Sequence, residues 1–222
     1  MIELQNLCKT FESKNGEHFT ALKNITLHIN AGEMVQFQGV SGSGKSTLLH
    51  ILASLLKPTS GRVEIAGENI ASYSDYYASL YRRDTVAYIT QSFHLLGELT
   101  LRENLLPPLV IKELSFKEIN AATRKALEIA NIAHKADEKV ANLSGGEKQR
   151  AVIARAIVND ADIILCDEPT ANLDKANALK FLEIIKELKR KGKTIVIATH
   201  DPLFDDLDII DKRFMLKEGH LE

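Results

Sequence analysis

The sequence predicts an α/β domain with a mostly parallel sheet and an inserted helical segment. In residues 1–91 and again in 157–222, strand-like apolar runs alternate with segments of helical periodicity. Such alternation favours a parallel sheet that is covered by helices. Between these two parts, residues 92–156 show a helical pattern throughout. We therefore expect one domain over 1–222, in which 1–91 and 157–222 form the core and 92–156 a helical subdomain.

The individual elements follow from periodicity and from turn residues. Alternating apolar and polar residues indicate a first strand, and the turn at Asn15-Gly16 leads to a second strand that is broken near Lys23. Strands are predicted at about 2–8, 19–29, 34–37, 62–66, 85–90, 162–166, 194–198 and 213–216, the last of the chain. Helices are predicted up to residue 56, at 116–131, at 148–158 and at about 174–190.

The stretch from Gly39 to Ser46 matches the phosphate-loop pattern G-x-x-x-x-G-K-[ST] at every fixed position. A predicted strand precedes it and a predicted helix follows it, which an ordinary Gly/Ser-rich turn does not require. Glycines let backbone N–H groups turn toward a phosphate at the start of a helix. Lys45 would reach the β- and γ-phosphates, and the Ser46 hydroxyl would ligate Mg²⁺. The chain is therefore predicted to bind nucleotide phosphates.

A second glycine-rich segment, Leu143-Ser-Gly-Gly-Glu147, opens a predicted helix. Ser144 and Glu147 have the spacing of a capping box, which is a structural explanation by itself. However, Gly145 and Gly146 each cost about 1 kcal/mol of helix propensity. They are explained if the bare backbone approaches an anion at the helix N-terminus.

Charged and polar residues follow two apolar strands. Asp167 and Glu168 end the strand 162–166, and His200 follows the strand 194–198. Ligands bind at the carboxyl ends of the strands in open α/β sheets. After a phosphate loop, Asp167 is the expected Mg²⁺ ligand and Glu168 a candidate general base for an attacking water. A histidine at a strand end is more often structural when it stands alone.

Taken together, these segments predict one phosphate loop and a second anion site in a separate helical subdomain. Both sites could face one phosphate within a chain. Alternatively, the second could close over the nucleotide of another copy, so that ATP is buried in a shared interface and its hydrolysis opens that interface.

Composition excludes several classes of protein. The formal net charge is -2, and the Lys/Arg-rich segment 186–193 is interspersed with Glu and Leu, as on a solvated helix face. No nucleic-acid partner is therefore expected.

No apolar run approaches the roughly 18 residues of a membrane span, and no signal segment is recognised. We expect a cytoplasmic protein, for which any action on a membrane would require a partner. Cys8 and Cys166 are expected to be buried, reduced thiols, and the histidines show no metal-site spacing.

These segments resemble the motifs of the ATP-binding-cassette (ABC) ATPases over nearly the whole chain. Residues 39–46 look like Walker A, Gln91 like the Q-loop glutamine and 143–147 like the LSGGQ signature. Residues 163–168 look like Walker B, 171–174 like the D-loop and His200 like the switch histidine. The resemblance implies a P-loop NTPase fold with a RecA-like core, an N-terminal antiparallel β part and a helical subdomain that carries the signature.

The resemblance also implies an ATPase that uses ATP and Mg²⁺ and forms a nucleotide-sandwich dimer with a second copy. Its catalytic residues would be Glu168, His200, Gln91 and Lys45. Its metal ligands would be Ser46, Gln91 and Asp167. Its nucleotide-binding residues would be Phe11, which would stack on adenine, Gly39, Ser41, Gly42, Ser43, Gly44, Lys45, Ser46, Thr47, Ser144, Gly145, Gly146 and Asp174, with 144–146 acting across the dimer. Phe11 could instead be an ordinary strand residue.

Within this superfamily, several stretches look like the macrolide-exporter and lipoprotein-release (MacB/LolD) group, among them 57–61, 81–83, 91–100 and Glu103-Asn104. That likeness implies a peripheral subunit on the cytoplasmic face of the cell membrane, which drives a transmembrane permease docked near 91–110 in export or extraction. Phe11, Glu147, Ala171 and Cys166 depart from common family residues. The departures at Ala171 and Cys166 could slow or tune coupling between the two sites, but none of the four damages the catalytic set.

Two other classes share the chemistry. A regulatory ABC ATPase of cell-envelope or cell-division machinery would transport no substrate. A soluble ABC ATPase of translation or DNA repair is disfavoured, because such proteins usually carry tandem cassettes or long coiled coils, for which 222 residues leave no room.

Overall fold

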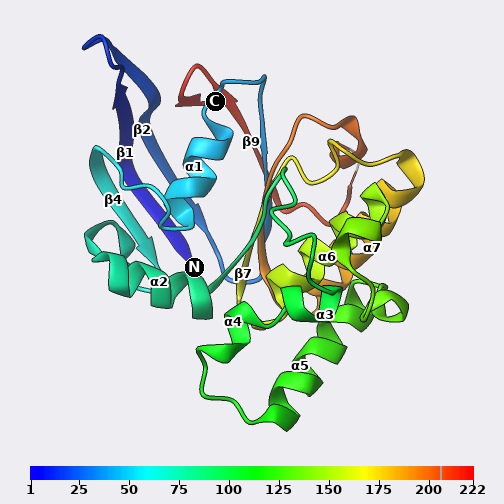
Figure 1. The fold of residues 1–222 in the computed structure, drawn as a ribbon. Coiled ribbons are helices and arrows are strands. Elements are labelled where there is room, and N and C mark those ends of the chain that lie inside the picture. Colours follow the sequence, from blue (N-terminus) through cyan, green and yellow to red (C-terminus); the bar gives the residue numbers. More distant parts are fainter. Residues whose placement is uncertain (206) are drawn as a thin grey trace.

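A computed structural model describes residues 1–205 and 207–222, which form two sheets with helix α1 (Lys45–Leu52) between them (Figure 1). The smaller sheet is antiparallel with the strand order β2-β1-β4-β5. Its strands are β1 (Ile2–Glu12), β2 (His18–Ile29), β4 (Ser60–Ile65) and β5 (Glu68–Asn69). The turn at Asn15-Gly16 joins β1 to β2, as predicted. β2 runs through the expected break, which survives as irregular register beside Asn24, a residue with φ of 53°.

The larger sheet has the order β10-β9-β3-β8-β7-β6, and its neighbouring strands are parallel except for the pair β9 and β10. Its strands are β3 (Met34–Gln38), β6 (Val86–Ile89), β7 (Ile163–Asp167), β8 (Thr194–Ala198), β9 (Lys212–Lys217) and β10 (His220–Leu221). Every residue of β7 and β8 is buried, which explains why these strands are continuous apolar runs. The predicted mostly parallel sheet with an N-terminal antiparallel part is confirmed.

The α-helices are α1 (Lys45–Leu52), α2 (Asp75–Asp84), α3 (Leu101–Asn104), α4 (Pro107–Val110), α5 (Phe116–Ile129), α6 (Gly145–Ile157) and α7 (Lys175–Arg190). Among the described residues, 3₁₀ turns span Ile70–Ser72, Ala133–Lys135, Val140–Asn142 and Pro202–Phe204. Capping boxes at Thr100, Ser115 and Ser144 start α3, α5 and α6.

Three details of the sequence prediction were wrong. The helix after the phosphate loop ends at Leu52 instead of near 56, because Ser54 with φ of 51° reverses the chain. Helix α2 was missed because only Ala78 and Tyr81 of its ten residues are buried. Two buried apolar positions are too few to form a recognisable helical repeat. The strand at 213–216 is not the last one, since the two-residue strand β10 follows it.

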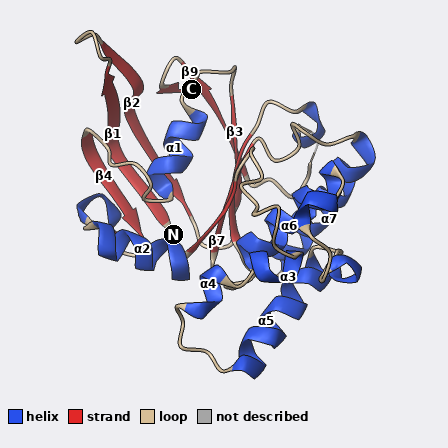
Figure 2. Cartoon of the chain, viewed as in Figure 1, coloured by secondary structure: helices blue, strands red, loops and turns tan. Residues whose placement is uncertain are grey.

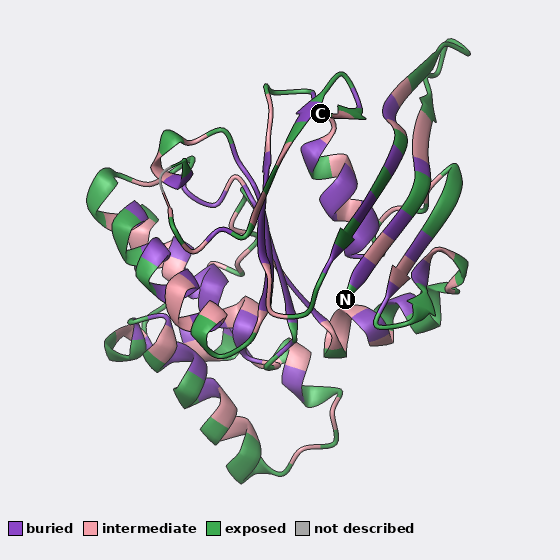
Figure 3. Cartoon of the chain, turned by 180° about the vertical axis from the view of Figure 1, so that it is seen from behind, coloured by how far each residue is buried: buried purple, intermediate pink, exposed green. Residues whose placement is uncertain are grey.

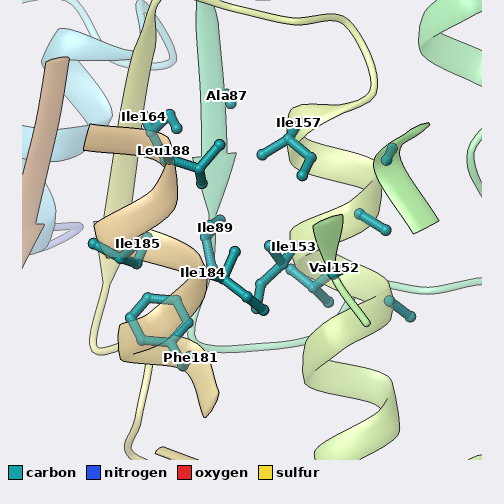
Figure 4. Close-up of a cluster of buried hydrophobic side chains, with 14 of the residues drawn as sticks. Ala87, Ile89, Val152, Ile153, Ile157, Ile164, Phe181, Ile184, Ile185 and Leu188 are labelled. Carbon is teal, nitrogen blue, oxygen red and sulfur yellow. The ribbon is translucent and has the colours of Figure 1, made fainter. Parts of the chain in front are cut away.

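Two apolar cores lie on the two faces of the larger sheet, and Figures 2 and 3 show the helices around its buried strands. One core lies between this sheet, α1 and the antiparallel sheet. The other lies between this sheet, α6 and α7, where Ile89, Val152, Ile153 and Phe181 meet (Figure 4). In the described part of 92–156, strand pairing amounts to one isolated bridge, Thr100 with Lys139. Helix α6 shares a core with the sheet, and the division into a core and a helical subdomain stays a prediction.

The two cysteines differ in their surroundings. Cys166 is fully buried, and burial raises the pKa of its thiol. Cys8 is only half-buried, which corrects the expectation for it, and its Sγ lies 3.1 Å from Asn24 Oδ1. Within the described residues, no helix has the length and apolar character needed to span a bilayer.

Candidate functional site

The predicted phosphate loop connects β3 to α1, and the backbone there requires glycine at two positions. A Cβ atom on Gly39 would lie 2.2 Å from the main-chain oxygen of Leu216, and one on Gly44 would lie 2.5 Å from that of Ala21. Both glycines also have positive φ, at 147° and 108°. The loop is therefore pressed against β9 and β2, and this packing fixes the path of the backbone that would face a phosphate.

A cavity of about 350 Å³ gathers most of the predicted site residues. Its lining consists of Phe11, Phe19, Ala21, Ser41, Gly42, Ser43, Gly44, Lys45, Ser46, Thr47, Gln91, Glu168 and His200. The structure thus brings the phosphate loop, Gln91, the candidate base and the histidine to one place. Ser43 is 3% exposed, and its hydroxyl has no hydrogen-bond partner among the described residues. A buried polar atom without a partner is costly, so this hydroxyl fits a ligand that supplies an acceptor.

The Lys45 ammonium lies inside the phosphate loop. It donates to the main-chain oxygen of Gly39 at 2.6 Å and to that of Val40 at 3.2 Å. It also lies 3.5 Å from Glu168 Oε1, and the two side chains are 6% and 13% exposed. A phosphate entering this loop would therefore compete for the lysine with two carbonyls and a carboxylate.

The Glu168 carboxylate is held by residues of the segment that follows β8. Thr199 Oγ1 donates to its Oε2 at 3.0 Å, and His200 Nδ1 lies 2.9 Å from its Oε1. The backbone of Glu168 is in the left-handed region, with φ of 44°, and its N–H donates to the main-chain oxygen of Ala198 at 2.8 Å. Non-glycine residues in this conformation cluster at functional sites, because the surrounding structure must hold them there. Thr199 and His200 thus each contact one oxygen of this carboxylate, which is part of the cavity lining.

Asp167, one residue earlier, has an oxygen next to the predicted metal-binding hydroxyl. Ser46 Oγ donates to Asp167 Oδ1 at 3.0 Å, and Tyr88 Oη donates to Oδ2 at 3.3 Å. Burial raises the pKa of Asp167 above its usual value, against the opposing hydrogen bond from Ser46. The adjacent hydroxyl and carboxylate are hard oxygen donors of the kind that Mg²⁺ prefers. Among the described residues no group of three or more His, Cys, Asp or Glu side chains could hold a metal. A cation held by Ser46 and Asp167 would take its other ligands from phosphates and water.

Two aromatic residues are part of the cavity lining. Phe11 on β1 and Phe19 on β2 are cross-strand partners, and the Lys9 ammonium lies 5.0 Å from the centroid of the Phe11 ring. Phe19 is 61% exposed and was not among the predicted site residues. Its place opposite Phe11 follows from the turn at Asn15-Gly16, so hairpin register was the signal that could have found it.

The signature-like segment starts α6, and its capping box is confirmed. Glu147 N–H donates to Ser144 Oγ at 3.4 Å, and Ser144 N–H donates to Glu147 Oε2 at 2.8 Å. The backbone hydrogen bond from Ser144 lowers the pKa of Glu147. A Cβ on Gly145 would meet open space, whereas one on Gly146 would lie 2.5 Å from Asn177 Nδ2. The sequence interpretation of Gly146 was therefore incomplete, since an intramolecular contact also requires a small residue there.

Asp174 precedes α7 and belongs to a network that reaches α6. It accepts hydrogen bonds from Asn177 N at 2.8 Å and from Asn177 Nδ2 at 2.9 Å. Arg150 Nη1 of α6 donates to Asn177 Oδ1 at 2.9 Å. Asp174 and residues 144–146 are not among the described residues that line the cavity of about 350 Å³. The structure therefore leaves the second predicted anion site outside the cavity of its own chain.

The loop that follows Gln91 is held by side chains from two other segments. Asn172 Nδ2 donates to the main-chain oxygen of Gln91 at 3.1 Å. Arg155 of α6 donates from Nη2 to the oxygen of Phe93 at 3.0 Å and from Nη1 to that of His94 at 2.5 Å. These contacts could not be recognised in the sequence, because the hydrogen-bonded residues lie 27 to 81 positions apart in the chain. The side chains that were missed are those of Asn172, Arg150, Arg155 and Asn177.

Comparison with known proteins adds a further line of evidence. A protein family described as ABC transporter matches residues 22–171. The chain is 40% identical over 203 residues to the macrolide export ATP-binding/permease protein MacB of Salmonella paratyphi A, covering 91% of this chain and 31% of that protein. It is 41% identical over 213 residues to the lipoprotein-releasing system ATP-binding protein LolD of Pseudoalteromonas translucida, covering 96% of this chain and 89% of LolD. The chain thus spans about a third of the length of the MacB relatives that it matches.

A solved structure with the same fold is the dimer of an ATP-binding cassette in a post-hydrolysis state, bound to ADP and Pi. Its TM-score is 0.91 at 37% identity, and the match covers 100% of this chain and 97% of that one. The expected fold class, a P-loop NTPase of the cassette type, is confirmed by this likeness.

Proposed function

The chain belongs to the ABC transporter family, and on that premise we propose that it is the ATP-hydrolysing subunit of a membrane complex that exports or extracts its cargo. ATPase activity follows from the family and from the cassette structure that holds ADP and Pi. The likeness to MacB and LolD supports export or extraction as the direction of work. The place of action would then be the cytoplasmic face of a membrane.

The observation that carries this proposal is the division of the site. The phosphate loop, Gln91, Glu168 and His200 share one cavity, while the open N-terminus of α6 at Gly145 lies outside it. We propose that Ser144, Gly145 and Gly146 of a second copy close over the γ-phosphate that this cavity binds. The dimeric cassette structure supports such a pair. Asp174 would then lie between the two sites and couple them.

Within the closed dimer, each side chain would have a defined task. Glu168, oriented by Thr199 and His200, would accept a proton from the attacking water. Gln91 and His200 would position that water and the γ-phosphate, and Lys45 would stabilise the negative charge of the transition state. The adenine would stack on Phe11, and residues 39–47 would surround the phosphates. Release of the γ-phosphate removes the contacts that hold the two copies together and so reopens the dimer.

Ser46, Asp167 and Gln91 would hold Mg²⁺. The hydrogen bond between Ser46 and Asp167 supports this assignment, because it places both oxygens at one point beside the cavity. When bound, Mg²⁺ neutralises part of the phosphate charge.

We propose that a permease docks on an apolar hollow next to the Gln91 loop. The hollow measures about 510 Å³ and is lined by Leu99, Glu103, Leu106, Pro107, Val110 and Ile111. Val110 and Ile111 are 66% and 64% exposed, which is unusual for two neighbouring aliphatic residues. Buried Asn104 joins this surface to the Gln91 loop, because its side chain makes hydrogen bonds to both backbone groups of Leu96. A displacement of this surface by the permease would therefore be transmitted through Asn104 and Leu96 to the loop that begins at Gln91.

The first experiment is affinity purification of tagged Glu168→Gln protein from detergent-solubilised native membranes with ATP, with partners identified by mass spectrometry. We expect a permease with few membrane helices and a large extracytoplasmic domain. A cell-division or cell-wall partner would instead indicate a regulatory ATPase, and recovery of the cassette alone or with ribosomes would contradict the membrane role.

Two additional substitutions test the docking surface in the same background. Ile111→Asp should abolish recovery of the permease while ATP binding is retained. Phe116→Asp is the matched control, since Phe116 is 80% exposed but lies outside the hollow, and it should leave recovery unchanged.

A further inference from the structure

Tyr88 projects from β6 toward the predicted metal carboxylate. β6 pairs in parallel with β7, and Tyr88 is the register partner of Leu165. Because side chains alternate between the two faces of a sheet, Leu165 and Asp167 project on the same face as Tyr88. Helix α1 packs on that face, and its residues Ser46 and His50 are one helical turn apart. Three separate elements therefore meet around one carboxylate.

Each oxygen of the Asp167 carboxylate has its own donor. Ser46 Oγ donates to Oδ1 at 3.0 Å, whereas Tyr88 Oη donates to Oδ2 at 3.3 Å. Asp167 is 7% exposed, so water has little access to replace either bond. The His50 ring packs edge-on against the Tyr88 ring, with centroids 5.8 Å apart and an angle of 89° between the planes. The tyrosine is thus fixed at its ring and donates from its hydroxyl.

We propose that Tyr88 is a positioning residue for the metal site, whose hydroxyl anchors Oδ2 of Asp167 and thereby presents Oδ1 to Ser46 and to Mg²⁺. This inference rests on the proposed function, in which Ser46 and Asp167 hold the cation. A carboxylate with one anchored oxygen has lost a rotation that metal binding would otherwise have to restrict. Partners of metal ligands typically change metal affinity 10- to 100-fold when they are removed. A neutral donor at 3.3 Å is at the long end of hydrogen bonding, so we expect a smaller effect.

The test compares nucleotide binding with and without metal in the Glu168→Gln background, where turnover is suppressed. The dissociation constant of a fluorescent ATP analogue is measured in excess MgCl₂ and again in excess EDTA. The ratio of the two constants gives the gain in affinity that is due to the metal. We expect Tyr88→Phe to reduce this gain about three- to tenfold, while the affinity in EDTA stays unchanged, because the phenylalanine ring keeps the packing against His50.

Two control variants separate the possible causes. Tyr81→Phe removes another buried hydroxyl, which donates to the main-chain oxygen of Leu52 at 2.8 Å away from the carboxylate, and it should leave the ratio unchanged. Asp167→Asn should abolish most of the gain. If Asp167→Asn retains the gain, the metal role of Asp167 is wrong and the proposed site fails. If Asp167→Asn loses the gain but Tyr88→Phe keeps it, or weakens binding equally in EDTA, the role of Tyr88 alone is overturned.

Discussion

The side-chain amide of Asn172 donates a hydrogen bond to the main-chain oxygen of Gln91 at 3.1 Å. These residues are 81 positions apart and belong to the D-loop-like and Q-loop-like segments. The contact joins the segment that would face a second copy to the loop that would follow the permease. A displacement of the Asn172 side chain would therefore act on the Gln91 backbone.

The Asn172 contact should affect catalysis more than binding. Asn172→Ala removes the donor and frees the Gln91 backbone, so we expect a two- to tenfold lower kcat with an unchanged KM for ATP, corresponding to a hydrogen bond of about 0.5–1.5 kcal/mol. Steady-state ATPase kinetics measure both constants. A changed KM with normal kcat would contradict this role.

Glu168→Gln should bind ATP and hardly turn it over, with kcat reduced at least about 100-fold, because a general base contributes 10²–10⁴-fold. Single-turnover hydrolysis and size-exclusion chromatography with ATP measure the defect and the expected dimer. Thr199→Val, which removes one hydrogen bond to the carboxylate, should give a milder loss. Normal turnover of Glu168→Gln would remove this residue from the role of base.

Lys45→Ala should lower the affinity for ATP by at least about tenfold, because a charge-assisted contact to the phosphates is lost. Equilibrium binding of a fluorescent nucleotide measures the change. Lys57→Ala is a matched control, since Lys57 is a lysine of the turn 57–61 and does not line the cavity. Unaffected affinity in Lys45→Ala would contradict the phosphate-loop assignment.

The two cross-strand phenylalanines should contribute to base binding. Phe11→Ala should weaken ATP binding in line with the loss of about 1–3 kcal/mol of base stacking, and Phe19→Ala should weaken it less, because Phe19 is the more exposed ring. Competition binding with ATP and with inorganic triphosphate measures the difference. Neither variant should affect triphosphate, and an equal loss for both ligands would indicate a damaged phosphate loop instead.

Glu33 should make the free energy of unfolding depend on pH. Burial alone would raise its pKa, but hydrogen bonds from Lys212 and Asn30 outweigh burial and lower the pKa to about 2. A depressed folded-state pKa stabilises the protein above the unfolded value near 4.5, and the contribution is lost as pH falls toward 2. The Glu33→Gln variant should thus have a free energy of unfolding about 1 kcal/mol lower at pH 7. This value is smaller than the pKa shift alone would give, because the ion pair between Glu33 and Lys212 is partly exposed to solvent.

Urea unfolding of wild type and Glu33→Gln between pH 7 and pH 3 checks this expectation. The difference between them should narrow below about pH 4.5. Glu12→Gln, an exposed glutamate at the end of β1, provides the control. A difference that stays constant down to pH 3 would show that the ion pair does not carry the effect.

The sequence predicted much of the fold, and its candidate site residues include most of those that line the cavity beside the loop 39–46. The stretch from β3 through Gly39–Ser46 to α1 is a local strand, loop and helix, so its conformation is encoded within about 20 residues. The same holds for the capping box of Ser144 and Glu147. Helix α2 escaped because few of its residues are buried, and Phe19 escaped because its role depends on a partner strand.

By itself, the sequence determined where most strands end and where helices begin, because the conformation of a turn or a helix cap depends on residues that are close neighbours along the chain. Only the tertiary structure decided which distant residues meet. In the larger sheet β3 lies beside β8 and β9, and β7 lies beside β6, although none of these pairs is joined by a hairpin. That order brings Tyr88 to Asp167, while the packing of loops and helices brings Asn172 to Gln91 and Asn177 to Gly146. Such contacts depend on the burial of whole elements against one another, which no single segment of the sequence specifies.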